Sequence, residues 1–195
     1  MSAGGAWHVP GLTGLRALAA LWVLVHHFNA VVGWRPLHVE LAGIRVELTP
    51  LATCGWVGVD IFFVLSGFLV TQSWLARPAL APYAAARVLR IYPALVAATV
   101  FTMAVAGATG SLPWREYLAS PQTWRYFVRT ASGIDVVDKL PGAFATNPFP
   151  YAANGSLWTL PVELRLYVAL GLAGIAGLLA RPRAWLAAGF LLVAA

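Results

Sequence analysis

Long apolar runs separated by shorter, charged connectors dominate the pattern of this chain. Four of these runs are each near the roughly 20 residues that an α-helix needs to cross a bilayer. We expect spans at about residues 12–32, 53–74, 88–108 and 157–180, and a fifth that begins at Ala184 and is cut off at Ala195. The pattern therefore predicts an all-α fold, a polytopic transmembrane helix bundle with four full spans and a truncated fifth.

The stretch 109–156, between the third and fourth runs, has a different character. It mixes prolines and aromatic residues with charges, a combination suited to the headgroup zone of a membrane. Its most apolar part, residues 124–137, contains Arg125, Arg129 and Asp135, so we expect an outer loop with an interfacial helix rather than a further span. No internal repeat appears, and residues 1–195 are interpreted as a single, incomplete membrane domain.

The composition supports a membrane protein and narrows its partners. Hydrophobic residues make up 60% of the chain, charged residues only 10%, and the mean hydropathy is +0.75. The 13 Arg and Lys residues are scattered between apolar runs, which argues against the basic stripe of a nucleic-acid-binding protein. The single cysteine, Cys54, excludes an intramolecular disulfide, and the four histidines lack zinc-ligand spacing. We therefore expect membrane lipid but no nucleic acid as a partner, and no metal site.

The connectors predict the orientation in the membrane. Those after the second and fourth runs carry arginines and no acidic residue, whereas the other connectors mix signs. The arginines concerned are Arg77, Arg87, Arg90, Arg181 and Arg183. By the positive-inside rule these two connectors are cytoplasmic. We therefore expect a multi-pass protein of the plasma (inner) membrane with a cytoplasmic N-terminus, and with residues 33–52 and 109–156 outside.

Two ionisable side chains, Arg16 and His27, interrupt the first apolar run. At about 100° and 1.5 Å per residue, the step between them places both on one helix face, roughly 16 Å apart in depth. Such groups are costly in hydrocarbon and usually face a bundle interior or a wet cavity, so we interpret the pair as functional. The alternative is that Arg16 extends to the headgroups and His27 satisfies a buried hydrogen bond.

Two further arginines, Arg87 and Arg90, share the cytoplasmic level with Arg16. Because they are one helical turn apart, their guanidinium groups can converge on a phosphate group. The alternative is that both anchor the chain to anionic lipid heads.

Two carboxylates, Asp60 and Glu163, fall in the outer half of the membrane with His27. A carboxylate in that environment must be paired, protonated or hydrated, so each is a candidate to orient or charge the imidazole. The alternative is a buried ion pair with Arg165 or Arg16 that fixes helix packing.

Four motifs follow one another along the chain. They are GLRA at 14–17 followed by His27, GWVGVDIFFVLSGF at 55–68, RVLRIYP at 87–93, and SLWTLPVE at 156–163 followed by Tyr167. These motifs resemble those of the acyltransferase-3 family of membrane acyltransferases, in the same order and over most of residues 11–170. The family's chains are considerably longer, so the sequence resembles only their N-terminal half.

The resemblance implies O-acylation of a cell-envelope carbohydrate or a related small molecule. The donor would be a cytoplasmic acyl-coenzyme A, with acetyl as the expected group, and the acceptor a hydroxyl group toward the outer face. In the family the Arg and His of the first helix and the paired arginines are associated with activity, and here these are Arg16, His27, Arg87 and Arg90. The family usually has a polar residue after the glutamate of its last motif, where Leu164 stands here.

Acyl transfer from a thioester to an alcohol needs a general base, and a histidine suits that role near neutral pH. His27 is the candidate base, with Asp60 or Glu163 orienting its other nitrogen and Arg16 assisting. His26 is the fallback, because it is adjacent but turned by about 100° on the helix.

Other interpretations of the chain remain open. A transporter or flippase would also need intramembrane charge at two depths, and an inactive membrane fragment of the acyltransferase is a third possibility. A covalent acyl-enzyme is less favoured, because Ser66 lacks a G-x-S-x-G frame and Cys54 has no basic neighbour in sequence.

Overall fold

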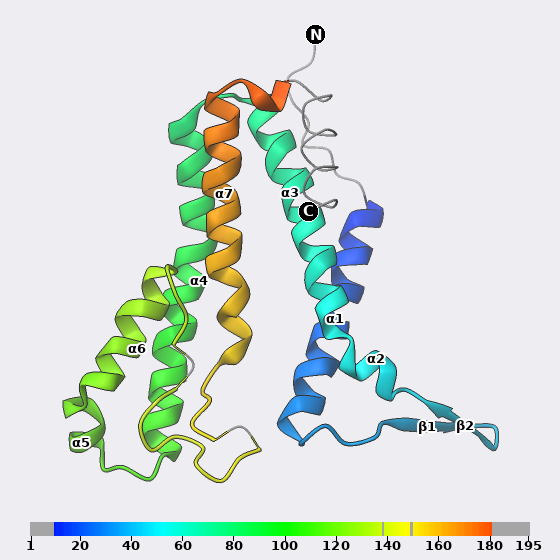
Figure 1. Ribbon diagram of the computed structural model, residues 1–195, viewed down its shortest axis with the longest axis vertical. Coiled ribbons are helices and arrows are strands. Elements are labelled where there is room, and N and C mark those ends of the chain that lie inside the picture. Colours follow the sequence, from blue (N-terminus) through cyan, green and yellow to red (C-terminus); the bar gives the residue numbers. More distant parts are fainter. Residues whose placement is uncertain (1–9, 138, 149, 181–195) are drawn as a thin grey trace, which may run out of the picture.

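The computed structural model describes residues 10–137, 139–148 and 150–180 of the chain. Four long helices form most of it: α1 (Pro10–Val31), α3 (Gly55–Ala76), α4 (Leu80–Thr109) and α7 (Thr159–Ile175) (Figure 1). Each lies in a segment long and apolar enough to cross a membrane. The predicted helical membrane bundle with four full spans is confirmed, whereas the fifth predicted span, from Ala184, lies outside the described residues.

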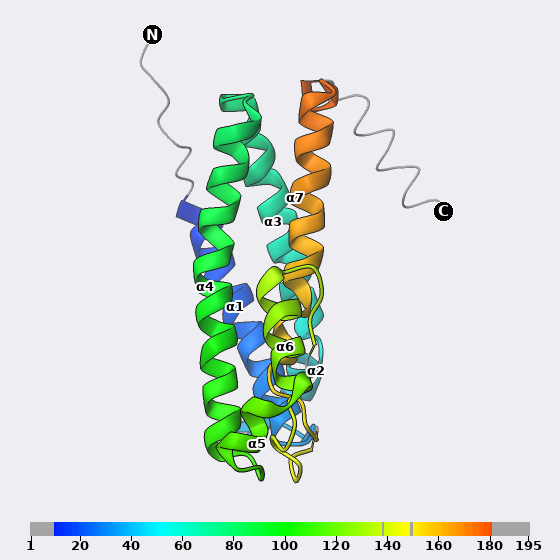
Figure 2. The same ribbon diagram turned by 90° about the vertical axis from the view of Figure 1, so that its left-hand side faces the viewer.

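The four helices alternate in direction and form two legs, one made by α1 with α3 and the other by α4 with α7 (Figures 1 and 2). At one end of the molecule, the turn end, residues 77–79 join α3 to α4 and the short η2 (Leu178–Ala180) follows α7. The opposite end, the loop end, carries α2 (Thr49–Thr53), the strands β1 (His38–Leu41) and β2 (Ile44–Glu47), and the segment that leads to η1 (Gly155–Trp158).

The two strands at the loop end form a small antiparallel hairpin. Leu41 pairs with Ile44, and the two residues between them, Ala42 and Gly43, have φ angles of +50° and +80°. Positive φ at both positions is what a tight two-residue hairpin turn requires. Every residue of both strands is exposed, so the hairpin projects from the bundle and adds nothing to its core.

Helix α4 begins earlier than the predicted third span, at Leu80 rather than near residue 88. The added residues are rich in alanine, the best helix former, and Pro82 lies in the first turn, where its missing N–H is tolerated. Arg87 and Arg90 were expected in the connector before this span. Instead they lie about two to three turns inside the helix.

The stretch predicted to hold an interfacial helix contains two helices, α5 (Trp114–Ala119) and α6 (Pro121–Ser132). Helix α6 ends at Gly133, whose φ of +70° gives the left-handed cap common at helix ends. Helix α6 packs against α4, and burial raises the pKa of Tyr117, which lies on the neighbouring α5, to about 12. The Tyr117 hydroxyl therefore stays protonated and donates to the carbonyl oxygen of Met103 in α4, at 3.0 Å.

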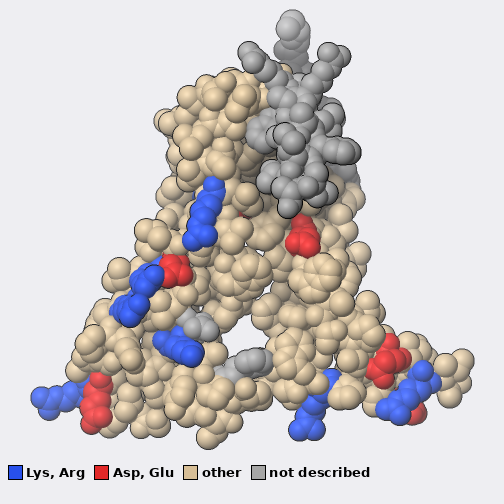
Figure 3. Space-filling model, in the orientation of Figure 1, with Lys and Arg blue, Asp and Glu red and all other residues tan. Residues whose placement is uncertain are grey.

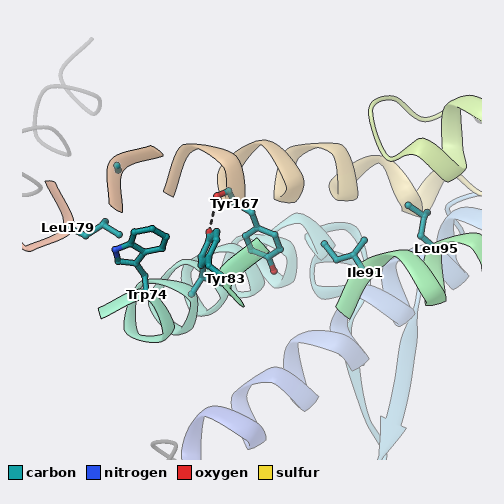
Figure 4. Close-up of a cluster of buried hydrophobic side chains, with 8 residues drawn as sticks. Trp74, Tyr83, Ile91, Leu95, Tyr167 and Leu179 are labelled. Atoms are coloured by element: carbon teal, nitrogen blue, oxygen red, sulfur yellow. Dashed lines mark hydrogen bonds between the residues drawn. The ribbon is translucent and has the colours of Figure 1, made fainter. Parts of the chain in front are cut away.

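A cluster of buried side chains joins α3, α4 and α7 near the turn end (Figure 4). Trp74 of α3 meets Tyr83 of α4 edge-on, with ring centroids 5.2 Å apart, and the Tyr83 hydroxyl donates to the carbonyl oxygen of Tyr167 in α7 at 2.8 Å. Ile91 and Leu95 continue the cluster along α4. Many large apolar side chains elsewhere on the long helices are exposed, as expected for helices that face lipid.

Two glycines allow α1 and α3 to approach closely. A Cβ atom at Gly55 would lie 2.3 Å from the His26 side chain, and one at Gly58 would lie 2.8 Å from a methyl group of Val23. The same atom at Gly58 would also lie 2.9 Å from the carbonyl oxygen of Ala19, which belongs to the α1 backbone. Only a residue without a side chain fits at such a crossing, as is common where membrane helices pack.

Replacing Gly58 by valine is therefore expected to destabilise the protein by about 1–3 kcal/mol, because α1 must move away from α3 to make room. Gly67→Val on the same helix is the matched control, since nothing lies within 4 Å of a Cβ atom at that position. Thermal unfolding of both variants in detergent measures the difference. Equal stability of the two variants would show that the close helix crossing is not needed.

Candidate functional site

A cavity of about 280 Å³ lies between the two legs, where Figure 3 shows the molecule hollowed. Its wall combines apolar side chains of α1 and α3 with a set of polar groups from α1, α3, α4, η1 and α7. The polar lining residues are Arg16, His27, Ser66, Arg90, Ser156, Thr159 and Glu163. We call this the small cavity, and four of the residues predicted from the sequence, Arg16, His27, Arg90 and Glu163, meet in its wall.

The imidazole of His27 is oriented by its own helix. Its Nδ1 atom lies 2.8 Å from the carbonyl oxygen of Val23, one turn earlier in α1. A carbonyl oxygen only accepts hydrogen bonds, so this contact fixes the proton of the neutral ring on Nδ1. The Nε2 lone pair is then the basic site of the ring, and the partner of the other nitrogen is this backbone carbonyl rather than Asp60 or Glu163.

His26 has a different environment, although it is the neighbour of His27. Its Nδ1 lies 3.0 Å from the carbonyl oxygen of Ala52 and 3.3 Å from the amide nitrogen of Gly55, and its ring meets the indole of Trp34 edge-on at 5.0 Å. It does not belong to the lining of the small cavity. This histidine connects α1 to the α2–α3 junction, and its ring also meets that of His27 edge-on, with centroids 5.5 Å apart.

The carboxylate of Glu163 is held by two hydroxyl groups. Ser66 on α3 donates to its Oε1 atom at 3.1 Å, and Tyr167, one turn after Glu163 on α7, donates to the same oxygen. The Ser66 and Tyr167 oxygens are themselves 3.1 Å apart. Sequence reasoning considered Ser66 only as a poor nucleophile and quoted Tyr167 only as part of a motif. The spacing of Tyr167 four residues after Glu163 was the available signal, because it places both side chains on one helix face.

The two arginines of α4, Arg87 and Arg90, have different surroundings. Arg90 lines the small cavity, whereas Arg87 donates to the Ser73 hydroxyl at 3.2 Å and lies against the rings of Tyr83 and Tyr167, at 5.5 and 5.6 Å from their centroids. The buried Nε atom of Arg87 has no hydrogen-bond partner among the described residues. The two arginines therefore line different cavities, and the convergence of their guanidinium groups on one phosphate group stays a prediction.

A larger cavity of about 730 Å³ lies between α4, α7 and the residues that follow α6. Arg87 and Arg165 line it, with Tyr83, Tyr92 and Tyr167, and the Arg165 guanidinium donates to the carbonyl oxygen of Ile134 at 3.4 Å. Tyr167 belongs to both sites, because it lines the larger cavity while its hydroxyl contacts residues of the small cavity.

The other predicted carboxylate, Asp60, is exposed on α3 and does not line the small cavity. Within the part of the chain that the structure describes, no three His, Cys, Asp or Glu side chains gather in a way that could hold a metal ion.

The small cavity combines one imidazole, one carboxylate and two guanidinium groups. This set can accept a proton and can stabilise negative charge that develops on a substrate.

Comparison with known proteins identifies a family and several relatives of this chain. A family model described as an acyltransferase domain matches residues 9–195. The chain is 31% identical over 163 residues to an O-acetyl transferase of Shigella phage Sf6, a match that covers 81% of this chain and 44% of that protein. It is 36% identical over 191 residues to nodulation protein 10 of Rhizobium leguminosarum bv. viciae, with 92% and 47% covered.

A shorter match reaches a peptidoglycan O-acetyltransferase of Listeria monocytogenes. The chain is 39% identical to it over 70 residues, which cover 36% of this chain and 8% of that protein. The chain spans about half the length of the phage and rhizobial relatives. No solved structure matches it significantly.

Proposed function

This chain belongs to the membrane acyltransferase family whose domain model it matches, and from that membership we propose that it moves an acetyl group from acetyl-coenzyme A to a hydroxyl of an envelope carbohydrate. The observation that carries the proposal is the meeting of His27, Glu163, Arg16 and Arg90 in one cavity between two membrane-spanning legs. The names of the phage and Listeria relatives support O-acetylation, and peptidoglycan in the latter name supports a carbohydrate acceptor.

In the proposed reaction His27 is the general base. The acceptor hydroxyl oxygen attacks the carbonyl carbon of the thioester, its proton passes to Nε2 of His27, and the carbon–sulfur bond breaks. The imidazolium then returns the proton to the departing thiolate, so the ring is ready for the next turnover. The contact of Nδ1 with the Val23 carbonyl supports this assignment, because it leaves Nε2 free to take the proton.

The charged neighbours have separate proposed roles. The carboxylate of Glu163 stabilises the imidazolium that forms on His27, and Arg90 stabilises the negative charge on the reacting carbonyl oxygen. Arg16, about three turns from His27 on α1, stabilises negative charge elsewhere on the donor. Phosphate groups suit guanidinium geometry, so Arg90 binds the donor from the small cavity and Arg87 contacts it from the larger cavity. Asp60, exposed outside the small cavity, has no proposed contact with the reacting groups.

The proposed orientation follows the positive-inside rule. Arg77, in the turn between α3 and α4, supports a cytoplasmic location of the turn end, and the loop end would then face outward. Both Arg87 and Arg90 lie in the half of α4 nearer the turn end, the side from which a cytoplasmic donor would arrive. The donor would thus enter from one side of the membrane and the acceptor from the other.

Membrane vesicles prepared from cells that produce the complete protein test the function and the orientation together. Inverted vesicles, which expose the cytoplasmic face, should incorporate radioactive acetyl from acetyl-coenzyme A into carbohydrate, and sealed right-side-out vesicles should not. Incorporation by right-side-out vesicles alone would reverse the orientation. Carbohydrate movement across the membrane without covalent labelling would identify a transporter instead.

A further inference from the structure

We infer that Ser66 and Tyr167 are positioning residues, which fix the carboxylate of Glu163 at the wall of the small cavity and act on the reaction only through it. The inference rests on the proposed acyl-transfer function and assigns a role in it to two residues that need not touch a substrate. Two hydroxyl groups donate to one carboxylate oxygen, Oε1, so Glu163 is held in one orientation. Among the described residues, both of these hydrogen bonds reach Oε1 and none reaches the second oxygen, Oε2.

The hydroxyl of Tyr167 is a rigid donor because the rest of this residue is fixed from α4. Its carbonyl oxygen accepts the hydrogen bond from Tyr83, and its ring lies against the guanidinium group of Arg87. Only 4% of the residue is exposed. A side chain confined in this way loses little further freedom when it binds the carboxylate, so the contact favours one geometry of Glu163.

Ser66 supplies the second contact from a different helix. Glu163 and Tyr167 both belong to α7, so α7 alone could hold them together. Only α3 can place Ser66 against both the Glu163 carboxylate and the Tyr167 hydroxyl. The carboxylate is therefore fixed relative to both legs of the molecule. This matters because the proposed base, His27, lies on the leg made by α1 and α3, whereas Glu163 lies on the other.

A purely architectural role would explain the same hydrogen bonds, because polar groups often join helices in membranes. The two roles predict different results. An architectural contact contributes to stability independently of the function of Glu163, whereas a positioning residue contributes to the rate only while the carboxylate that it orients is present. A double-mutant cycle separates the two cases.

The experiment measures incorporation of radioactive acetyl from acetyl-coenzyme A by vesicles that contain the complete protein. Ser66→Ala and Tyr167→Phe are each expected to lower kcat by about 10- to 100-fold with little change in the KM for acetyl-coenzyme A, since each removes a hydrogen bond to a charged group. In a Glu163→Gln background, either change should lower kcat by less than about 3-fold more. Ser66→Thr, which keeps the hydroxyl, should recover most of the rate.

The matched control is Tyr117→Phe, which removes the hydrogen bond to Met103, a contact outside the lining of the small cavity, and should leave kcat unchanged. The amount of each variant in the membrane and its thermal stability are measured alongside, and if Ser66→Ala does not fold, Tyr167→Phe completes the cycle alone. Full multiplicative losses in the double variants would overturn the positioning role, as would an acetyl group found covalently on Ser66. If the wild-type protein transfers no acetyl group, the proposed function itself is overturned. If it transfers acetyl but the losses in the double variants multiply, only the positioning role is overturned.

Discussion

His27→Gln is expected to lower the rate of acetyl transfer by about 10²–10⁴-fold, the usual contribution of a general base. Glutamine is similar in reach to histidine and its amide can still donate to the Val23 carbonyl, which the Nδ1 atom contacts at 2.8 Å. Its oxygen cannot take the proton of the acceptor hydroxyl at neutral pH, so the chemical step is lost while the contact to the helix is kept. Transfer of labelled acetyl to carbohydrate by vesicles, normalised to the amount of inserted protein, measures the loss.

His26→Gln is the matched control, because the two histidines are adjacent on α1 but only His27 lines the small cavity. His26 contacts Ala52 and Gly55, so its replacement should lower thermal stability more than it lowers the rate per folded molecule. Near-normal transfer by a well-inserted His27→Gln protein would remove His27 from the mechanism. A large loss of rate in His26→Gln with unchanged stability would move the base to His26.

Arg90→Ala is expected to raise the KM for acetyl-coenzyme A by about 10- to 150-fold, which corresponds to the loss of about 1.5–3 kcal/mol from charge-assisted hydrogen bonds. Arg90→Lys should recover only part of the affinity, because the planar fork is lost. Arg87→Ala should weaken donor binding less and stability more, since Arg87 already donates to Ser73 and packs between two tyrosine rings. Initial rates over a range of donor concentrations provide these values.

Arg125→Ala provides the charge-matched control for both arginines. Arg125 is exposed on α6 and lines neither cavity, so its removal lowers the positive charge of the protein without touching a proposed donor contact. An equal change of KM in Arg125→Ala and Arg90→Ala would indicate a general effect of charge near the membrane. An unchanged KM in Arg90→Ala would assign Arg90 to anchoring in the membrane instead.

Hydropathy alone was sufficient to predict the four spans, because each must satisfy its backbone inside a helix and cover it with apolar side chains. The predicted start of the third span, near residue 88, lies about two turns after the start of α4 at Leu80. The prediction relied on apolar content, whereas the residues after Leu80 form helix through their alanine content and the helix extends to include Arg87 and Arg90. The length of a helix and the length of its apolar run are different quantities.

The lining of the small cavity could be anticipated only in part. His27 and Glu163 stood out because an ionisable group in an apolar run is expensive, and that cost is visible in the sequence. Asp60 carries the same signal, yet it is exposed outside the cavity, because the direction of a side chain depends on how α3 is rotated about its axis. The spacing of Tyr167 four residues after Glu163 signals their contact, whereas the contacts of Tyr167 with Ser66 and Tyr83 were not predictable, since they depend on where α3, α4 and α7 meet.

The junction of the two legs near the turn end has a mechanical consequence. Gly174 of α7 is so close to Trp74 of α3 that a Cβ atom there would lie 2.2 Å from the indole ring, and α3 with α7 makes the main contact between the legs. The two legs therefore meet most closely at this indole. The imidazole of His27 belongs to one leg and the carboxylate of Glu163 to the other. By simple leverage, a small rotation about this contact would change the separation of the two legs more at the loop end than near Trp74.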